Sequence, residues 1–589
     1  MTASAAAPGP ALVEAAAERF QLGLGLSATL ARLLAARGWR ELDAVVEFLY
    51  PRLEHTHSPW LMAGMAAAVE RILAAVAAGE PIRILGDYDA DGTLATVILR
   101  QALRTLGAAC SYELPERLGD GYGLQAATVE RAVAAGVRLA ITVDNGIREQ
   151  EALERARELG LDVIVTDHHL PPESLPPAVA ILNPHQPGCS YPDKSLCGSG
   201  VAFKLAQALL ERSGPAGEEQ TAAWPPRLRS YLKLVALATI ADAVPLLGEN
   251  RVLTRFGLEG LTEPVNPGLR ALLASALPPG HEGRITSSDV SFRIVPRINA
   301  AGRMGAADQV VELFAVPAAE AQQLAQALDQ LNRERQVLCD RIEAEALAQI
   351  AADAGASGEP ILMLAGEGWH RGVLGIVANR LLQRAGKPVL VLALENGVAH
   401  GSGRAPAGFH LLQVLERRPE LFVRFGGHAQ AVGCTLATER LPELRALLAS
   451  APREAPAAPD PVFEIRLAEL TPAFARELAR LEPYGEANPE PWFLVRGVEL
   501  ARPPERLKER HLKLAVAQGE CRHTALFWNL WRDERYQTAP RRPSFEALQS
   551  GACLDLVFRL ESGTHPQYGW RQQLILRDFF VTSAARANS

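Results

Sequence analysis

The sequence predicts a mixed α/β protein with a parallel-sheet α/β domain, a long helix, a second α/β domain and a C-terminal β-barrel. Three observations predict this. From Ile82 onward, strand-like runs alternate with helical windows, which is typical of βαβ units. The charged window Ala318–Ala352 has no Pro or Gly and predicts one helix of roughly 50 Å. After the Ala- and Pro-rich stretch Ala451–Pro461, short strands dominate.

The length of 589 residues suits three or four domains. We divide the chain into an N-terminal helical segment (1–50), an α/β domain (51–315), a connecting helix (316–353), a second α/β domain (354–450) and a barrel domain (456–585). Several short strands in about 125 residues favour an OB-fold for the last of these.

Composition sets broad limits on function. The seven cysteines show no CxxC spacing, which argues against a zinc ribbon or a disulfide scaffold and favours a reducing cytoplasm. We see no signal peptide and no run of about 20 apolar residues, so we expect no membrane span. The net charge of −7 does not decide for or against nucleic acid, because a binding groove needs only a local basic patch. We expect a monomer.

Acidic residues follow several strands of the first domain. In such folds ligands bind at the carboxyl ends of the strands, where Asp87, Asp144 and Asp167 fall. The strand candidates are Ile82–Leu85, Cys110–Leu114, Leu139–Val143, Leu161–Thr166 and Val179–Leu182.

The segment Asp87-Tyr88-Asp89-Ala90-Asp91-Gly92 is the most informative of these sites. Three carboxylates at alternate positions on a strand-to-helix turn suit hard divalent cations. An EF-hand loop is excluded, because its twelfth position would be Ile98 and a strand precedes it. A surface acidic turn is the other interpretation.

Three further motifs are ambiguous alone. Asp144-Asn145-Gly146 could be an ordinary turn. Asp167-His168-His169 could be a structural pair, although imidazole suits Mn²⁺ or Zn²⁺. Asp242 could cap a helix. Their conjunction at strand and helix ends of one α/β unit favours a metal centre.

Together these motifs resemble the DHH phosphoesterase superfamily. Additional segments resemble its RecJ family, and two positions depart from that pattern: Glu116, where Asn is more usual, and Ala431-Val432-Gly433, where Ala-Ala-Gly is usual. The segments are Pro115-Glu116-Arg117, Asp120–Leu124, Thr239–Leu246, Pro296–Arg303, Trp369–Val377, Phe425–Ala429 and Gly485–Pro491.

The resemblance implies a two-metal site that binds two divalent cations, Mn²⁺ or Mg²⁺. The implied ligands are Asp89, Asp91, Asp144, His168 and Asp242, with Asp144 as the bridge. Asp87 would complete or support one site, and His169 would face the scissile phosphate; with Asp144 these two are the candidate catalytic residues.

Substrate would bind through cations and glycine-rich backbone, chiefly in the second α/β domain. An alternative for Gly426 and Gly427 is that they only form a tight turn. The candidates are Arg117, Tyr122, Arg297, Asn299, Arg303, Arg371, Ser402, Arg404, Gly426, Gly427 and His428.

The barrel region carries a local positive charge. From Ala501 to Phe545 there are ten Lys and Arg against five Asp and Glu. Phe527, Trp528 and Trp531 interleave with these cations, and such a combination suits single strands, whose bases stack on aromatic rings. The alternative is that the aromatics form the barrel core.

From the resemblance we expect a single-stranded-DNA-specific 5′-to-3′ exonuclease that releases mononucleotides in DNA repair and recombination. Single-stranded DNA is the expected partner, with a single-strand-binding protein and a helicase as further candidates. Two alternatives stay open: a DHH phosphodiesterase for oligoribonucleotides or cyclic dinucleotides, and a non-catalytic DNA-binding scaffold.

Overall fold

The computed structural model divides into two compact units. It describes residues 9–115, 123–213, 224–279, 281, 283–352, 358–452, 461–530, 548–565 and 569–582. The barrel unit comprises 1–55, 245–252 and 459–589, and the two-sheet unit comprises 56–244 and 253–458.

The first sheet of the two-sheet unit has five parallel strands in the order β2-β1-β3-β4-β5. The parallel sheet predicted from the sequence is confirmed. The strand order reverses between β1 and β3, and a doubly wound sheet binds ligands at such a switch point. The strands are β1 Ile82–Leu85, β2 Cys110–Glu113, β3 Leu139–Val143, β4 Asp162–Thr166 and β5 Ala180–Leu182.

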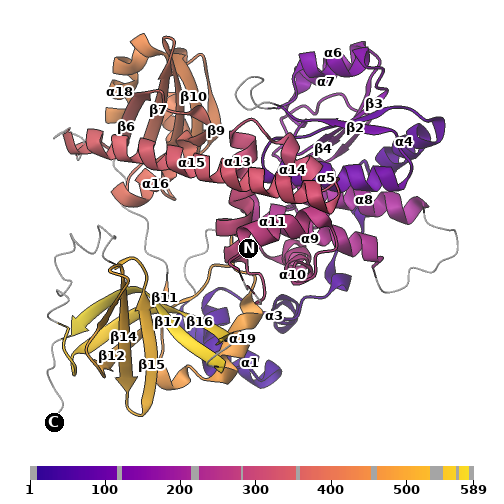
Figure 1. Ribbon diagram of the computed structural model, residues 1–589. Helices are drawn as coiled ribbons and strands as arrows, with labels where there is room; N and C mark the ends of the chain where they lie inside the picture. The colour runs from indigo at the N-terminus through magenta and orange to yellow at the C-terminus, as the bar shows by residue number, and fades with distance from the viewer. Residues whose placement is uncertain are drawn as a thin grey trace. The chain divides into compact units, whose positions relative to one another are not determined.

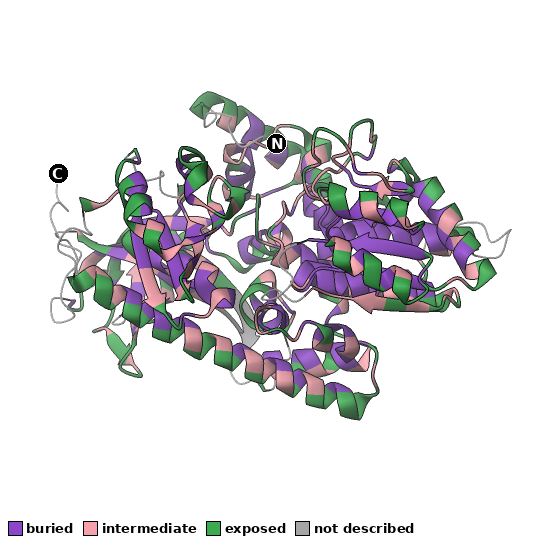
Figure 2. Ribbon diagram, turned by 90° about the horizontal axis from the view of Figure 1, so that it is seen from above, coloured by how far each residue is buried: buried purple, intermediate pink, exposed green. Residues whose placement is uncertain are grey.

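Helices cover both faces of this sheet. Figure 1 shows α6 and α7 on one side of it and α5 and α8 on the other. The strands between them are mostly buried, except β2, and the outer helix faces are exposed (Figure 2). The helices of this region are α4 Met65–Ala78, α5 Ala90–Thr105, α6 Ala126–Ala134, α7 Gln150–Glu158, α8 Gly198–Ser213 and α9 Pro226–Ala241.

A mainly helical stretch follows. Its helices are α10 Gly248–Gly260, α11 Pro267–Ala276, α12 Ser287–Asp289, the π-helix η3 Val290–Ile294, α13 Val295–Arg303 and α14 Asp308–Leu313.

Within the described part of the chain no single helix is long and apolar enough to cross a membrane. The bent helix pair Leu53–Leu61 and Met65–Ala78 passes the same test on length and composition.

The predicted long helix is confirmed as α15, Ala318–Ala352. Its buried residues recur at helical spacing, for example Ala321, Ala325 and Leu328 near its start and Ile342 and Ala346 near its end. This stripe packs on α11, α13 and α14 first and on α16 later. The helix therefore packs against both halves of the unit, although buried Asn332 and exposed Val337 interrupt its apolar stripe midway.

The second sheet is mixed and has the order β6-β7-β8-β10-β9, with only β6 and β7 parallel. The alternative that Gly426 and Gly427 only form a tight turn is wrong, because both lie within β9. A Cβ on Gly427 would lie 2.2 Å from the Ala431 oxygen, so β10 can pair closely only with glycine there. The elements are β6 Leu362–Glu367, α16 Leu374–Ala385, β7 Val389–Glu395, β8 Val398–Arg404, α17 Leu411–Glu416, β9 Arg424–His428, β10 Ala431–Ala437 and α18 Leu441–Ala449.

The barrel unit contains seven strands in the order β11-β12-β16-β17-β15-β14-β13, and an additional pairing of β12 with β14 closes the barrel. The predicted C-terminal barrel is confirmed, although the short β13 was not foreseen. The strands are β11 Val462–Glu464, β12 Trp492–Leu500, β13 Glu505–Leu507, β14 His511–Gln518, β15 Cys521–Phe527, β16 Cys553–His565 and β17 Gly569–Thr582.

The N-terminal helices belong to the same core as the barrel. They are α1 Pro10–Leu24, α2 Ala28–Ala36 and α3 Leu42–Leu49. Phe20 and Leu34 are fully buried and share one apolar cluster with Phe493 and Phe558 of the barrel. The helical pattern predicted these helices but does not specify the partner of their apolar faces.

A buried arginine stabilises the barrel unit. Arg251 is 1% exposed, lies over the Phe48 ring and donates hydrogen bonds to five backbone carbonyls. These oxygens belong to Phe48 and to residues 480–483. One guanidinium thus connects the end of α3 to the segment that precedes β12.

We predict that Arg251→Leu lowers the free energy of unfolding by about 3–5 kcal/mol, because it leaves several buried carbonyls without a donor. Chemical denaturation measures this. Arg466→Leu is the control, because Arg466 is 80% exposed and forms only an exposed ion pair, which is worth about 0–1 kcal/mol. Equal effects of the two substitutions would contradict the role of Arg251.

Candidate metal centre and substrate cavity

The turn after β1 directs its carboxylates toward one point. Asp89 caps α5 by accepting hydrogen bonds from the backbone N–H groups of Asp91 (2.9 Å) and Gly92 (3.0 Å). A Cβ on Gly92 would lie 2.6 Å from the Asp87 Cβ, so glycine lets the chain fold back tightly. Asn299 Oδ1 accepts from the Ala90 N–H at 2.9 Å and fixes the start of the helix.

The turn after β3 places Asp144 in the left-handed region, with φ 63°. Asp and Asn tolerate this conformation better than other non-glycine residues. The Asn145 side chain donates to the carbonyls of Leu85 (3.3 Å) and Val143 (3.1 Å). Asn145 therefore ties the ends of β1 and β3 together, and its amide holds the turn.

Asp167 orients the histidine pair after β4. It is 1% exposed, and its Oδ1 accepts from the His169 Nδ1 at 2.7 Å and from the backbone N–H of His168 and His169. Burial alone would raise the pKa of Asp167, but these hydrogen bonds and the nearby imidazole hold it below its usual value. Sequence reasoning quoted Asp167 in its motif but gave it no role.

The N-terminus of α8 holds one more carboxylate. Asp91 accepts from the backbone N–H of Gly198 (2.6 Å) and Ser199 (2.7 Å). A Cβ on Gly198 would lie 2.7 Å from the Asp144 side chain. Sequence reasoning missed this contribution, for which Gly198-Ser199-Gly200 was the available signal.

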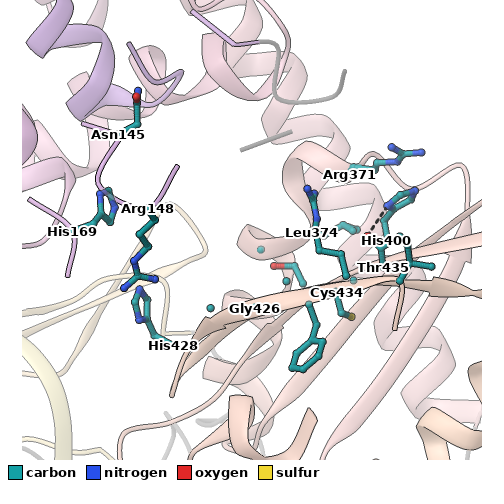
Figure 3. Close-up of a pocket in the computed structure, with 18 of the residues that line it drawn as sticks. Asn145, Arg148, His169, Arg371, Leu374, His400, Gly426, His428, Cys434 and Thr435 are labelled. Atoms are coloured by element: carbon teal, nitrogen blue, oxygen red, sulfur yellow. Dashed lines mark hydrogen bonds between the residues drawn. The ribbon is translucent and has the colours of Figure 1, made fainter. Parts of the chain in front are cut away.

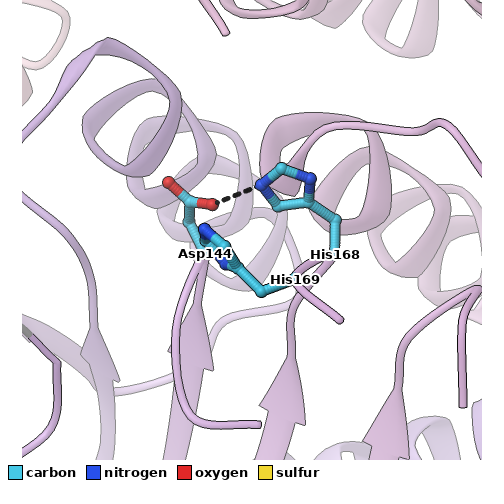
Figure 4. Close-up of side chains that lie close together, drawn as sticks. All are labelled: Asp144, His168 and His169. Carbon is cyan, nitrogen blue, oxygen red and sulfur yellow. Dashed lines mark ion pairs between the residues drawn. The ribbon is translucent and has the colours of Figure 1, made fainter. Parts of the chain in front are cut away.

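The predicted ligands meet around His168, and Figure 4 shows its ion pair with Asp144. Its Nε2 lies 3.1 Å from Asp144 Oδ1, 3.7 Å from Asp242 Oδ2 and 3.8 Å from Asp91 Oδ2. Three overlapping groups have ligand atoms within 4.8 Å of one another: Asp144, His168 and His169; Asp91, His168 and Asp242; and Asp87, Asp89 and Asp144. Asp144 and His168 each belong to two of them.

The charges in this cluster are strongly unfavourable without a cation. Burial, followed by the neighbouring carboxylates, raises the pKa of Asp144 well above its usual value and that of Asp242 to about 8. Asp144 Oδ1 accepts no hydrogen bond within the described part of the chain.

The spacing also fits cations. Oxygen ligands at about 2.0–2.6 Å from a shared Mg²⁺ or Ca²⁺ lie roughly 3–4 Å apart. The interatomic distances around His168 Nε2 fall in that range. The donor set, mostly carboxylate with one or two imidazoles, fits hard or intermediate divalent cations.

A cavity of about 1140 Å³ adjoins the cluster, and His169 lines it (Figure 3). Five predicted substrate residues line the same cavity: Arg371, Ser402, Gly426, Gly427 and His428. Three further basic residues of the lining were missed from the sequence: Arg148, His400 and Arg424. They lie on separate elements, and only the fold brings them together.

His169 lines this cavity and is held by Asp167. Burial alone would lower its pKa, but the hydrogen bond to Asp167 and the neighbouring carboxylates raise it to about 9. The same hydrogen bond fixes Nδ1 and orients the ring.

Four predicted substrate residues lie elsewhere in the two-sheet unit. Arg297 pairs with Asp329 at 2.7 Å, and Asn299 holds the start of α5. Arg303 donates to the Gly372 carbonyl at 2.9 Å. Arg404 donates to the Gly403 carbonyl at 2.7 Å. These four make protein contacts, and none lines the large cavity.

The aromatic candidates of the barrel differ from one another. Phe527 is 5% exposed and belongs to the barrel core, so it presents no face to a base, and this expectation is wrong. Trp528 is 47% exposed and packs edge-on against His511. Arg117, Tyr122 and Trp531 lie outside the described residues.

We predict that Gly198→Ala weakens Mn²⁺ binding by roughly tenfold or more, because the new Cβ displaces Asp144. Isothermal titration calorimetry measures the affinity. Gly200→Ala is the control, because the nearest atom to its added Cβ is a Leu196 side-chain carbon at 3.3 Å. Unchanged affinity in Gly198→Ala would contradict the close contact.

Three family models match the chain. They are the DHH family N-terminal domain at residues 81–239, the DHHA1 domain at 358–453 and the RecJ OB domain at 463–577.

Two relatives are each 38% identical to this chain and carry the name single-stranded-DNA-specific exonuclease RecJ. The Dickeya dadantii protein matches over 83% of this chain and 87% of its own length. The Bacillus subtilis protein matches over 81% of this chain, which spans 60% of the length of that relative.

Solved structures agree. RecJ from Thermus thermophilus in complex with Mn²⁺ superposes with a TM-score of 0.79 at 30% identity, covering 99% of this chain and 79% of that one. A second exonuclease RecJ, bound to manganese, gives a TM-score of 0.57 at 36% identity over 67% of this chain and 96% of that one. With a relative 38% identical over 87% of its length, this chain belongs to the RecJ family.

Proposed function

We propose that this protein is a single-stranded-DNA-specific 5′-to-3′ exonuclease that hydrolyses phosphodiester bonds with two divalent cations and releases 5′-mononucleotides. We further propose that it acts in DNA repair and recombination. The observation that carries the proposal is the overlapping cluster of carboxylates and imidazoles beside a cavity lined by cations. The names of its relatives support single-stranded DNA as the substrate.

Asp87, Asp89, Asp91, Asp144, His168 and Asp242 would hold the two cations, Mn²⁺ or Mg²⁺. When bound, two such cations activate a water for attack on phosphorus and stabilise the charge on the leaving oxygen. Asp144 belongs to two of the three ligand groups, which supports its assignment as the bridging carboxylate.

His169 would lie next to the cations and face the scissile phosphate. Asp167 fixes its Nδ1 and so orients the ring. An imidazole N–H in this position would stabilise negative charge that develops in the transition state. Asp167 acts through His169 and is a positioning residue.

The large cavity would take the terminal nucleotide. Arg148, in the loop after β3, and Arg371, in the helical turn before α16, line it, and the β9 backbone at Gly426 and Gly427 borders it. Arg371 pairs with Glu395, so a phosphate would compete for this guanidinium. Cations and exposed backbone amides together suit phosphate oxygens.

The barrel would hold the rest of the strand. Trp528 is one of the exposed aromatics of the barrel, and base stacking on such a ring does not depend on sequence.

We also propose that the protein is a cytoplasmic monomer that works with a helicase and a single-strand-binding protein, because its substrate arises where duplex DNA is unwound. All seven cysteines are free, which suits a reducing compartment.

Asp144→Asn tests the function. Asn tolerates the left-handed backbone of position 144 and preserves the side-chain shape, so the fold should persist. With Mn²⁺ and 5′-labelled single-stranded DNA, we expect mononucleotide release to fall more than a hundredfold while binding of the strand stays within about threefold.

Substrate controls separate the alternatives. Duplex DNA, RNA, cyclic dinucleotides and pyrophosphate are incubated in parallel with the wild-type protein. Cleavage of cyclic dinucleotides or short RNA without degradation of DNA would support the alternative phosphodiesterase. Strand binding without any hydrolysis would support a scaffold.

A further inference from the structure

The turn that follows β3 carries an arginine beside the metal centre. Arg148 comes shortly after Asp144 in the chain, is exposed and lines the large cavity. Its Nε donates to the Leu170 carbonyl at 2.8 Å, and Leu170 directly follows His169. Figure 3 shows Arg148 and His169 at the same end of the cavity. The arginine side chain therefore connects the loop of the candidate bridging ligand to the loop of the histidine pair.

Two carboxylates hold the backbone of this turn. Glu149 Oε2 accepts from the backbone N–H of Arg148 at 3.0 Å and from the N–H two residues earlier at 2.9 Å. Asp167, which orients His169 through one oxygen, accepts from the Ile147 N–H at 3.0 Å through the other. The backbone at Arg148 and the imidazole of His169 are thus fixed relative to each other.

The guanidinium of Arg148 has no acidic partner among the described residues. Its bond to the Leu170 carbonyl uses only Nε, so Nη1 and Nη2 remain for an anion. Arg371, which lines the same cavity, is by contrast paired with Glu395. A guanidinium that is already held at Nε loses little freedom when its two terminal nitrogens bind phosphate oxygens in a bidentate manner.

The lining of the cavity favours an anion as the partner of Arg148. Its two acidic residues are already engaged, Glu149 by backbone N–H groups and Asp167 by His169. A purely structural role for Arg148 would be to tie two loops through the Leu170 carbonyl, but that bond needs a single donor and not a guanidinium. The basic lining residues are Arg148, His169, Arg371, His400, Arg424 and His428.

We propose that Arg148 is a catalytic residue whose Nη1 and Nη2 bind non-bridging oxygens of the scissile phosphate, and that Glu149 positions it. The proposal rests on the proposed function, since it concerns the same reaction. A cation that is in place before the reaction stabilises the charge of the phosphoryl transition state. The scissile phosphate is favoured over the other phosphates of the strand, because Arg148 is fixed to the loops that carry Asp144 and His169.

Single-turnover hydrolysis with Mn²⁺ and 5′-phosphorylated single-stranded DNA tests the contact. Arg148→Ala should lower the rate roughly 10²–10³-fold, the usual cost of one transition-state donor, while the Kd of the strand rises about tenfold at most. Free guanidinium should restore part of this rate, which a purely structural role does not predict. Arg157→Ala is the control, because Arg157 is exposed on α7 and does not line the cavity; its rate should equal that of the wild-type protein.

Conservative variants test the positioning. One oxygen of Glu149 accepts both N–H groups of the turn, so Glu149→Gln should keep the rate within about threefold. Glu149→Ala should lower the rate roughly 10–100-fold, and free guanidinium should not restore it, because the Arg148 side chain is still present. Arg148→Lys should stay far below the wild-type rate, because one ammonium cannot replace a bidentate guanidinium.

The outcomes separate the possible failures. If the wild-type protein degrades DNA and Arg148→Ala does so at the same rate, the inference is refuted while the proposed function stands. A loss that free guanidinium leaves unchanged would assign Arg148 the structural role. A loss that disappears on a strand with a 5′-hydroxyl would move the contact to the terminal phosphate and refute the inference as well. If the wild-type protein degrades no DNA, the proposed function itself fails, and this inference with it.

Discussion

Electrostatic repulsion among buried carboxylates is the constraint on which this site depends. Asp144 is 3% exposed and Asp91 is 2% exposed, and both lie near Asp89 and Asp242. Bringing ionised carboxylates together away from water costs several kcal/mol per group, unless they take up protons or cations. The raised pKa values of Asp144 and Asp242 express that cost. Divalent cations remove it, so the same arrangement that opposes folding without metal provides a high-charge metal site.

Much of the surrounding structure holds the carboxylates in place. The amide of Asn145 ties two strand ends, the first amides of α8 bind Asp91, and Asp167 fixes His169. Each of these contacts is buried or partly buried and comes from a different loop. The reversal of strand order between β1 and β3 creates the space into which these loops project.

The sequence predicted the parts of this arrangement that depend on local pattern. Strand-like runs located β1 and β3 to the residue, and acidic residues directly after them indicated the metal centre. Local pattern does not reveal contacts between distant segments. Gly198 approaches Asp144 across the fold, Asn299 accepts from the Ala90 amide, and α1–α3 share the barrel core.

Glycine and aromatic residues were the least predictable from sequence. Gly426 and Gly427 suggested a turn, but close pairing with β10 makes the same glycines suit a strand. Phe527 and Trp528 are neighbours in sequence, yet Phe527, the last residue of β15, is buried and Trp528, just beyond the strand, is exposed. Burial decides which of them can stack on DNA, and burial depends on where β15 ends.

Anomalous diffraction from crystals soaked in Mn²⁺ tests the central claim most directly. The account predicts two peaks roughly 3.5–4 Å apart with Asp144 between them, and the loss of at least one peak in Asp144→Asn. A single peak, or manganese bound away from Asp144 and His168, would contradict it.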